Sequence, residues 1–143
     1  MAVLKPSRTA QYTLSAEFSW TAADTMLDIN GASTGFITAA AHTVEPIPLP
    51  VGAVVIGGEL VVTTAFDGST YAVIVGDSAS ANRYLGTADR KAAALTALVP
   101  TGYVSLGENI RLTITPTGTT TAGAATLRIR YTVVGRAQEV QIT

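Results

Sequence analysis

The side chains that could carry chemistry are few and scattered along the sequence. His42 is the single histidine of the 143-residue chain, and cysteine is absent. A serine-histidine-aspartate site would have to use His42, and we expect no G-x-S-x-G or similar nucleophile elbow. We therefore predict that the protein is not an enzyme and that His42 is an ordinary packing or surface residue.

The carboxylates indicate turns more than a metal site. Asp24 and Asp28, with Asn30 nearby, could be imagined as calcium ligands, but their spacing is not that of an EF-hand loop. Aspartate is far more common as a turn residue, and Asp67 and Asp77 stand where strands are expected to end. We expect no metal ion and no cofactor.

Three arginines form a candidate contact cluster. If the alternating residues 110–115 pair with residues 127–133, the polar faces of the two strands coincide, and Arg111, Arg128 and Arg130 lie close together. One interpretation is a solvated face on which the arginines have glutamate partners. The other is a cluster that meets an acidic patch on another subunit, where arginine is favoured.

Two further basic residues, Lys5 and Arg8, lie in the first ten residues, which show no periodicity. Terminal segments of this kind are often frayed. The alternative is an arm that docks onto a partner, so Lys5 and Arg8 join the three arginines as candidate contacts with a partner or another subunit.

The composition restricts the possible partners. The chain is 48% apolar but only 13% charged, and its net charge is −1. A surface with so few charges is suited to lying against other protein, because few charges would have to lose their water. No basic excess exists to neutralise phosphates, so we expect no nucleic-acid partner. No apolar span of 18 residues occurs, so we expect no membrane helix.

The elements that would position these residues are centred on residues 52–77. Two apolar runs flank the Asp-Gly sequence at Asp67, and this pattern predicts a β-hairpin at the centre of the core. Residues 110–115 and 127–133 predict a second hairpin. Residues 11–20 alternate apolar and polar side chains without a break, which is typical of a half-buried strand.

Other segments give weaker predictions. Residues 26–29 could form a short strand that ends at a turn, and the prolines of residues 44–51 favour an edge or crossover segment. Gly57 and Gly58 predict a bulge or bend. Residues 87–98 are the only helix candidate, with an irregular loop as the alternative. A short segment at residues 139–142 could add an edge.

Together these patterns predict an all-β fold with seven or eight strands. We expect an N-terminal arm at residues 1–10 and a jelly-roll-like domain at residues 11–143. That domain would be a single antiparallel β-sandwich with at most one short helix. The first residues lack the apolar run of a signal peptide, so we expect synthesis in the cytoplasm.

The sequence also resembles a known family. The resemblance lies in the texture and order of the strands over residues 46–137, in the segments IPLPVGAVVIGGELVVTTAFDG, VGD, NRYLG, PTGY, IRLTITPTG, TAG and LRIRYTVVGRA. They resemble the cement or decoration proteins of tailed bacteriophages. This resemblance implies a jelly roll on the outer surface of the virion capsid. It also implies a homotrimer that clamps neighbouring subunits of the major capsid protein.

A second function stays open at this point. A phage tail or head-fibre module that binds a host-surface glycan would need exposed aromatic rings. Tyr84 and Tyr103 lie in expected loops and are the residues placed for that role.

Overall fold

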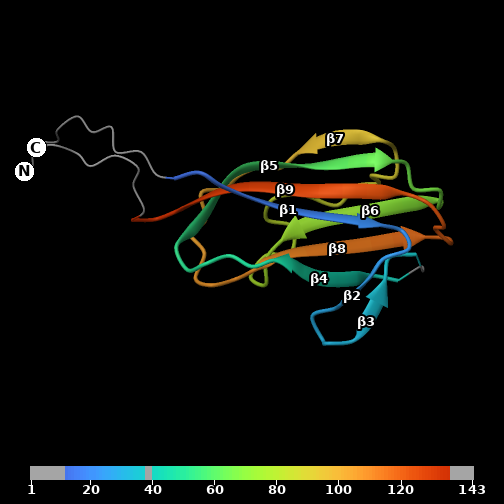
Figure 1. Cartoon of the computed structure of the whole chain (residues 1–143), viewed down its shortest axis with the longest axis horizontal. Coiled ribbons are helices and arrows are strands. Elements are labelled where there is room, and N and C mark those ends of the chain that lie inside the picture. Colours follow the sequence, from blue (N-terminus) through green and yellow to red (C-terminus); the bar gives the residue numbers. More distant parts are fainter. Residues whose placement is uncertain (1–11, 38–39, 136–143) are drawn as a thin grey trace, which may run out of the picture.

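The computed structural model describes residues 12–37 and 40–135, and within these residues it contains nine strands and no helix (Figure 1). The fold is an all-β, antiparallel, jelly-roll-like sandwich. No helix in this part of the chain is long and apolar enough to cross a membrane. The strands are β1 (Leu14–Thr21), β2 (Thr25–Leu27), β3 (Ser33–Gly35), β4 (His42–Ile47), β5 (Ala53–Thr64), β6 (Thr70–Gly76), β7 (Ala94–Ala97), β8 (Ile110–Thr117) and β9 (Ala124–Val133).

Two sheets make up the body of the molecule. The first has the strand order β1-β9-β5-β7, and the second has the order β4-β8-β6. The strands β2 and β3 form a separate small hairpin that projects beyond β4 (Figure 1). The hairpin turn contains Gly31 with φ +80°, a conformation that glycine adopts without a Cβ clash.

Neither of the two expected hairpins forms. β5 pairs with β9 and β7, whereas β6, which follows it, pairs with β8 in the other sheet. In the same way β8 and β9 are consecutive but belong to different sheets. The hairpin predictions were therefore wrong, because each connection crosses from one layer to the other. At that crossing the Asp67 carboxylate accepts hydrogen bonds from the backbone of Thr121 and Ala122, which joins the two connections.

An aromatic group joins the sheets inside the sandwich. Tyr71 on β6 is fully buried, and its ring stacks on Phe66 with a centroid separation of 3.7 Å. The indole Nε1 of Trp20 on β1 donates a hydrogen bond of 3.2 Å to the Tyr71 hydroxyl. Burial raises the pKa of Tyr71 to about 12, so this hydroxyl stays neutral. Each large side chain buried in this way contributes roughly 1.5–3 kcal/mol.

Three local predictions were confirmed. Along β1 the residues facing the second sheet are the more buried ones, as the alternation of residues 11–20 predicts. β4, which contains Pro46, is an edge strand, and its register with β8 shifts between Val44 and Ile47. The register of β5 with β9 shifts between Val55 and Gly57, so the glycine pair does mark a bulge.

The helix candidate at residues 87–98 was wrong. Asp89 forms an isolated bridge with Ala72, and the segment ends in β7. The Asp89 carboxylate accepts the backbone N–H of Tyr71, so it binds β6 and does not cap a helix. The large residue Leu98 alone is buried here, and the weak apolar stripe cannot hold a helix against the core. The expected arm at residues 1–10 and the edge at 139–142 lie outside the described residues.

A substitution at Gly58 tests whether the bulge in β5 requires glycine. Its φ is +146°, and a Cβ added there would lie 2.3 Å from the carbonyl oxygen of Arg128 and 3.0 Å from Cα of Ile129. We expect Gly58→Ala to destabilise the fold by about 2 kcal/mol, because both atoms belong to the paired strand and cannot move away. Urea unfolding followed by circular dichroism measures this. The matched control is Gly86→Ala, where a Cβ meets nothing within 4 Å, and equal losses for the two variants would contradict the account.

Candidate interaction surfaces

The three candidate arginines do not form one cluster. Arg111 lies on β8, whereas Arg128 and Arg130 lie on β9 in the other sheet. The prediction failed because it rested on the β8–β9 hairpin. Arg111 instead donates a hydrogen bond of 2.8 Å to Glu45 on the neighbouring strand β4. The Arg111 side chain also holds the pKa of Glu45 below its usual value.

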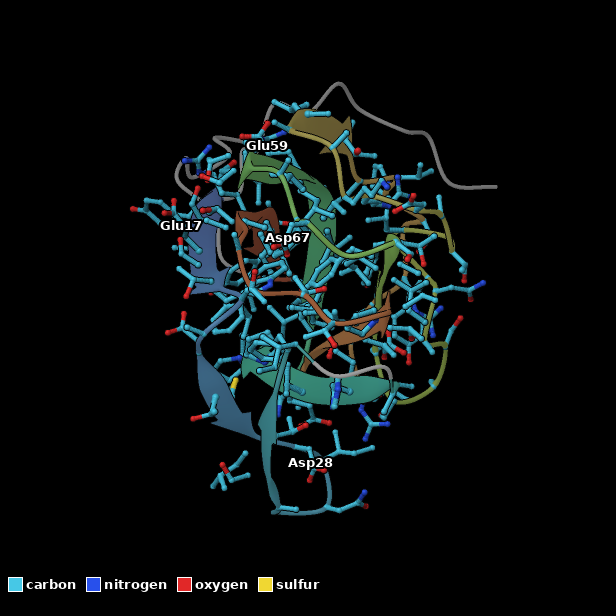
Figure 2. The ribbon with its side chains drawn as sticks, turned by 90° about the vertical axis from the view of Figure 1, so that its right-hand side faces the viewer. Glu17, Asp28, Glu59 and Asp67 are labelled. Atoms are coloured by element: carbon cyan, nitrogen blue, oxygen red, sulfur yellow. The ribbon has the colours of Figure 1, made fainter. Side chains whose placement is uncertain are left out.

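Arg128 lies between two glutamates on the outer face of the first sheet. It is directly opposite Glu17 of β1 and Glu59 of β5 in the strand register. Its Nε is 2.9 Å from Glu17, and its Nη1 is 3.1 Å from Glu59. Figure 2 shows Glu17 and Glu59 on the two strands that flank β9. The two carboxylates raise the pKa of Arg128, so the interpretation of a solvated face with glutamate partners describes both Arg111 and Arg128.

Arg130 is placed differently. It is exposed, and its guanidinium lies over Gly57, where an added Cβ would be 2.8 Å from Nη2. No carboxylate among the described residues pairs with it. Lys5 and Arg8 lie outside the described residues.

The aromatic platform expected for a glycan does not form. Tyr84 is buried, with 3% of its surface exposed, so the expectation that it is an accessible ring was wrong. The Tyr103 ring is covered by Arg83, whose guanidinium carbon is 3.6 Å from the ring centroid. Arg83 is in turn held by Asp77 at 2.6 Å, and the Tyr103 hydroxyl donates to Glu108 at 2.7 Å. Tyr84 is therefore inaccessible, and one face of the Tyr103 ring is covered by a side chain of the same protein.

The aspartates considered for calcium act as turn residues. One carboxylate oxygen of Asp28 accepts the backbone N–H groups of Asn30 and Ala32, and Asp24 accepts that of Thr21. Figure 2 shows Asp28 on the β2–β3 hairpin, apart from Glu17, Glu59 and Asp67. Within residues 12–37 and 40–135, no three metal-ligating side chains come together.

The expectation that the sequence contains no G-x-S-x-G pattern was wrong. Residues 31–35 read GASTG and match the G-x-S-x-G pattern of serine hydrolases. That pattern acts through a sharp strand-to-helix turn, whereas this segment is the turn and second strand of the β2–β3 hairpin. The hydroxyl that hydrogen-bonds Nδ1 of His42 belongs to Thr34, and Ser33 lies one position away on the opposite face of the strand.

An exposed apolar surface gathers at one end of the sandwich, where β5 begins and β9 ends (left in Figure 1). It consists of Val51, Val104, Leu106 and Val134, which we call the end patch, and their exposed fractions run from 44% to 76%. Gly52 donates to the carbonyl of Ser105 and accepts from the N–H of Val134. These hydrogen bonds bring three chain segments together. The sequence held no local signal for the patch, because its residues come from three separate loops.

Glu108 fixes the loop that carries Leu106. Its carboxylate accepts hydrogen bonds from the Tyr103 hydroxyl, the Ser105 hydroxyl and the backbone N–H of Leu106, at 2.7, 3.2 and 2.7 Å. The part of the end patch that contains Leu106 is therefore fixed by hydrogen bonds within its own loop.

Comparison with known proteins gives similarity of structure only. No family model matches the sequence, and no curated protein sequence matches it. A chain of the cyanophage Pam1 capsid asymmetric unit superposes with a TM-score of 0.62 at 20% identity. The superposition covers 93% of this chain and 94% of that one.

A chain of the acidic stable capsid structure of Helicobacter pylori bacteriophage KHP30 is also similar. It has a TM-score of 0.64 at 17% identity and covers 94% of this chain and 98% of that one. At these identities the comparisons establish a shared fold over nearly the whole of both chains.

Glu108 also makes the stability of the fold depend on pH. The Tyr103 hydroxyl, together with the backbone and Ser105, lowers the pKa of Glu108 from 4.5 to about 2. A carboxylate whose pKa is lowered by folding stabilises the fold above its unfolded pKa and stops doing so as the pH falls through its folded pKa. We expect the free energy of unfolding to decline between pH 4.5 and 2, and less steeply in Glu108→Gln. Denaturant titrations at several pH values measure how steeply the free energy of unfolding falls with pH in the wild type and in Glu108→Gln. We expect Tyr103→Phe to give an intermediate dependence. Identical slopes in all three proteins would contradict this role.

Proposed function

We propose that this protein is a structural virion protein. In this proposal it binds the outside of an assembled phage capsid as a homotrimer and links neighbouring subunits of the major capsid protein. It is made in the host cytoplasm and has no catalytic activity. The observation that carries the proposal is the end patch, an apolar docking surface on a fold shared with chains of two phage capsid structures.

The chemistry of the end patch suits a contact with protein. Four large aliphatic side chains are exposed there, and covering them stabilises a contact by about 25 cal/mol per Å² of apolar surface. Among the described residues the charge nearest to the end patch in sequence is Glu108, and its carboxylate already accepts hydrogen bonds within the loop. Docking therefore buries apolar surface without stripping water from an unpaired charge.

Stabilisation of the shell then follows from mass action. A protein that binds the assembled capsid but not its free subunits lowers the free energy of the assembled state alone. Disassembly must first remove the bound copies. A contact that is weak for one copy becomes strong when a trimer engages several subunits at once.

The homotrimer rests on the family resemblance and has its own test. We expect multi-angle light scattering of the purified protein to give three times the chain mass of 14.7 kDa. The same measurement on Leu106→Glu separates self-association from capsid binding, because the end patch is assigned to the capsid and the trimer should persist. A monomer at all concentrations would remove the trimer from the proposal and leave the capsid contact in place.

Capsid binding is tested with particles that lack this protein. We expect the wild-type chain to decorate them saturably and to raise the temperature at which they open. The double variant Val51→Glu/Leu106→Glu places two charges on the end patch and should bind at least tenfold more weakly, with an unchanged melting temperature of the free protein.

The matched control is Leu95→Glu on β7, which replaces an exposed leucine far from the end patch. We expect this variant to decorate the particles like the wild type. Equal loss of binding in both variants would mean that the end patch is not the contact. Absence of wild-type decoration on any such particle would overturn the proposed function.

A further inference from the structure

Arg130 lies beside the end patch, on the outer face of the first sheet. Val54 of β5 pairs with Thr132 of β9 on one side and forms a bridge with Val104 of the end patch on the other. These three residues therefore form one row across the sheet. Residues two apart on a strand share a face and lie about 7 Å from each other, so Arg130 stands next to this row and its surface is continuous with the end patch.

The bulge in β5 makes room for the Arg130 side chain. Gly57 is opposite Arg130 in the strand register, and a Cβ added to Gly57 would lie 2.8 Å from Nη2 and 3.5 Å from Cζ of the arginine. The guanidinium thus occupies the place that a side chain at position 57 would take. An arginine placed in this way loses less side-chain freedom on binding than one that extends freely into water.

The guanidinium of Arg130 has no charged partner in the described part of the chain. Glu17 and Glu59 lie on the two strands beside β9, but both carboxylates bond to Arg128. The residue opposite Arg130 on β1 is Ser15, which is neutral, and the two side chains line the same hollow of the surface. An exposed set of N–H donors therefore borders the apolar end patch.

We propose that Arg130 binds a carboxylate of the major capsid protein at the rim of the contact that the end patch makes. This inference rests on the proposed function and adds the chemistry of the partner. The capsid segment that covers the end patch must have an aspartate or glutamate beside its apolar side chains. The planar guanidinium suits this partner because its parallel N–H groups match the two oxygens of a carboxylate.

The rim position decides what the ion pair contributes. Arg130 stands outside the apolar patch and keeps part of its water, and exposed ion pairs of this kind add little affinity. They do steer association and favour one orientation of the partner, which an apolar surface alone specifies poorly. The contribution of Arg130 is therefore electrostatic and is screened by salt, whereas that of the end patch is not.

Removal of the charge tests the proposal in the decoration assay. We expect Arg130→Gln to bind particles that lack this protein about fivefold more weakly than the wild type at about 25 mM NaCl, and equally at about 0.5 M. The double variant Val51→Glu/Leu106→Glu should bind weakly at both concentrations.

The matched control is Lys91→Gln, which removes one positive charge at the opposite end of the sandwich. There the Lys91 ammonium donates to the carbonyl of Ser69, and the Lys91 carbonyl accepts the N–H of Phe66, just after the end of β5. We expect this variant to bind like the wild type at both salt concentrations.

A cross-link identifies the partner group. Arg130→Lys keeps the charge and supplies an amine, which a carbodiimide joins as an amide to a carboxylate in contact with it. We expect decorated particles to give a product in which residue 130 is joined to an aspartate or glutamate of the major capsid protein, identified by mass spectrometry. Lys91 is the internal control in the same sample and should give no such product.

Four results would overturn the proposal. Wild-type decoration that Arg130→Gln leaves unchanged at low salt removes the ion pair and leaves the proposed function in place, whereas absence of wild-type decoration removes both. A loss of equal size at both salt concentrations would mean that Arg130 acts by packing and not by charge. A smaller oligomer of Arg130→Gln in light scattering would mean that Arg130 faces another copy of this chain.

Discussion

The structure depends on the contact of Tyr71 with Trp20 and Phe66, because this contact ties one sheet to the other. Tyr71 stands on the second sheet, Trp20 on the first, and Phe66 on the connection between β5 and β6. The indole N–H would be an unsatisfied buried donor without the tyrosine hydroxyl. The stacked ring of Phe66 also restricts the connection between β8 and β9. A Cβ at Gly123 in that connection would lie 2.1 Å from the Phe66 ring. The crossings that make the fold jelly-roll-like are thus built around one aromatic group.

The polar side chains serve the same architecture. Asp67 joins two connections, Asp77 holds Arg83 over Tyr103, and Glu108 fixes the loop beside it. The lowered pKa values of Asp67 and Glu108, both about 2, reflect these hydrogen bonds. Perturbed carboxylates often mark active sites, but here each is explained by a loop that it holds. At the surface this leaves the apolar end patch and a face on which Arg128 is paired with Glu17 and Glu59.

Local patterns in the sequence predicted local features well. The alternation over residues 11–20 identified β1 and its buried face, and Pro46 and the glycine pair marked an edge and a bulge. Pairing between strands could not be predicted in this way, because alternation says which face is buried and not which sheet the strand joins. The arginine cluster failed for that reason. The end patch could not be foreseen, because it exists only after three distant loops are brought together.

The pairing of β1 with β9 also determines when the chain can fold. Glu17 and Arg128, which face each other across this pair, are 111 residues apart in sequence. A ribosome releases β1 long before it makes β9, so the first sheet cannot close until nearly the whole chain has emerged. During that interval the apolar face of β1 has no partner strand, and contacts this distant in sequence are slow to form. Closure of the first sheet is therefore a late step in folding.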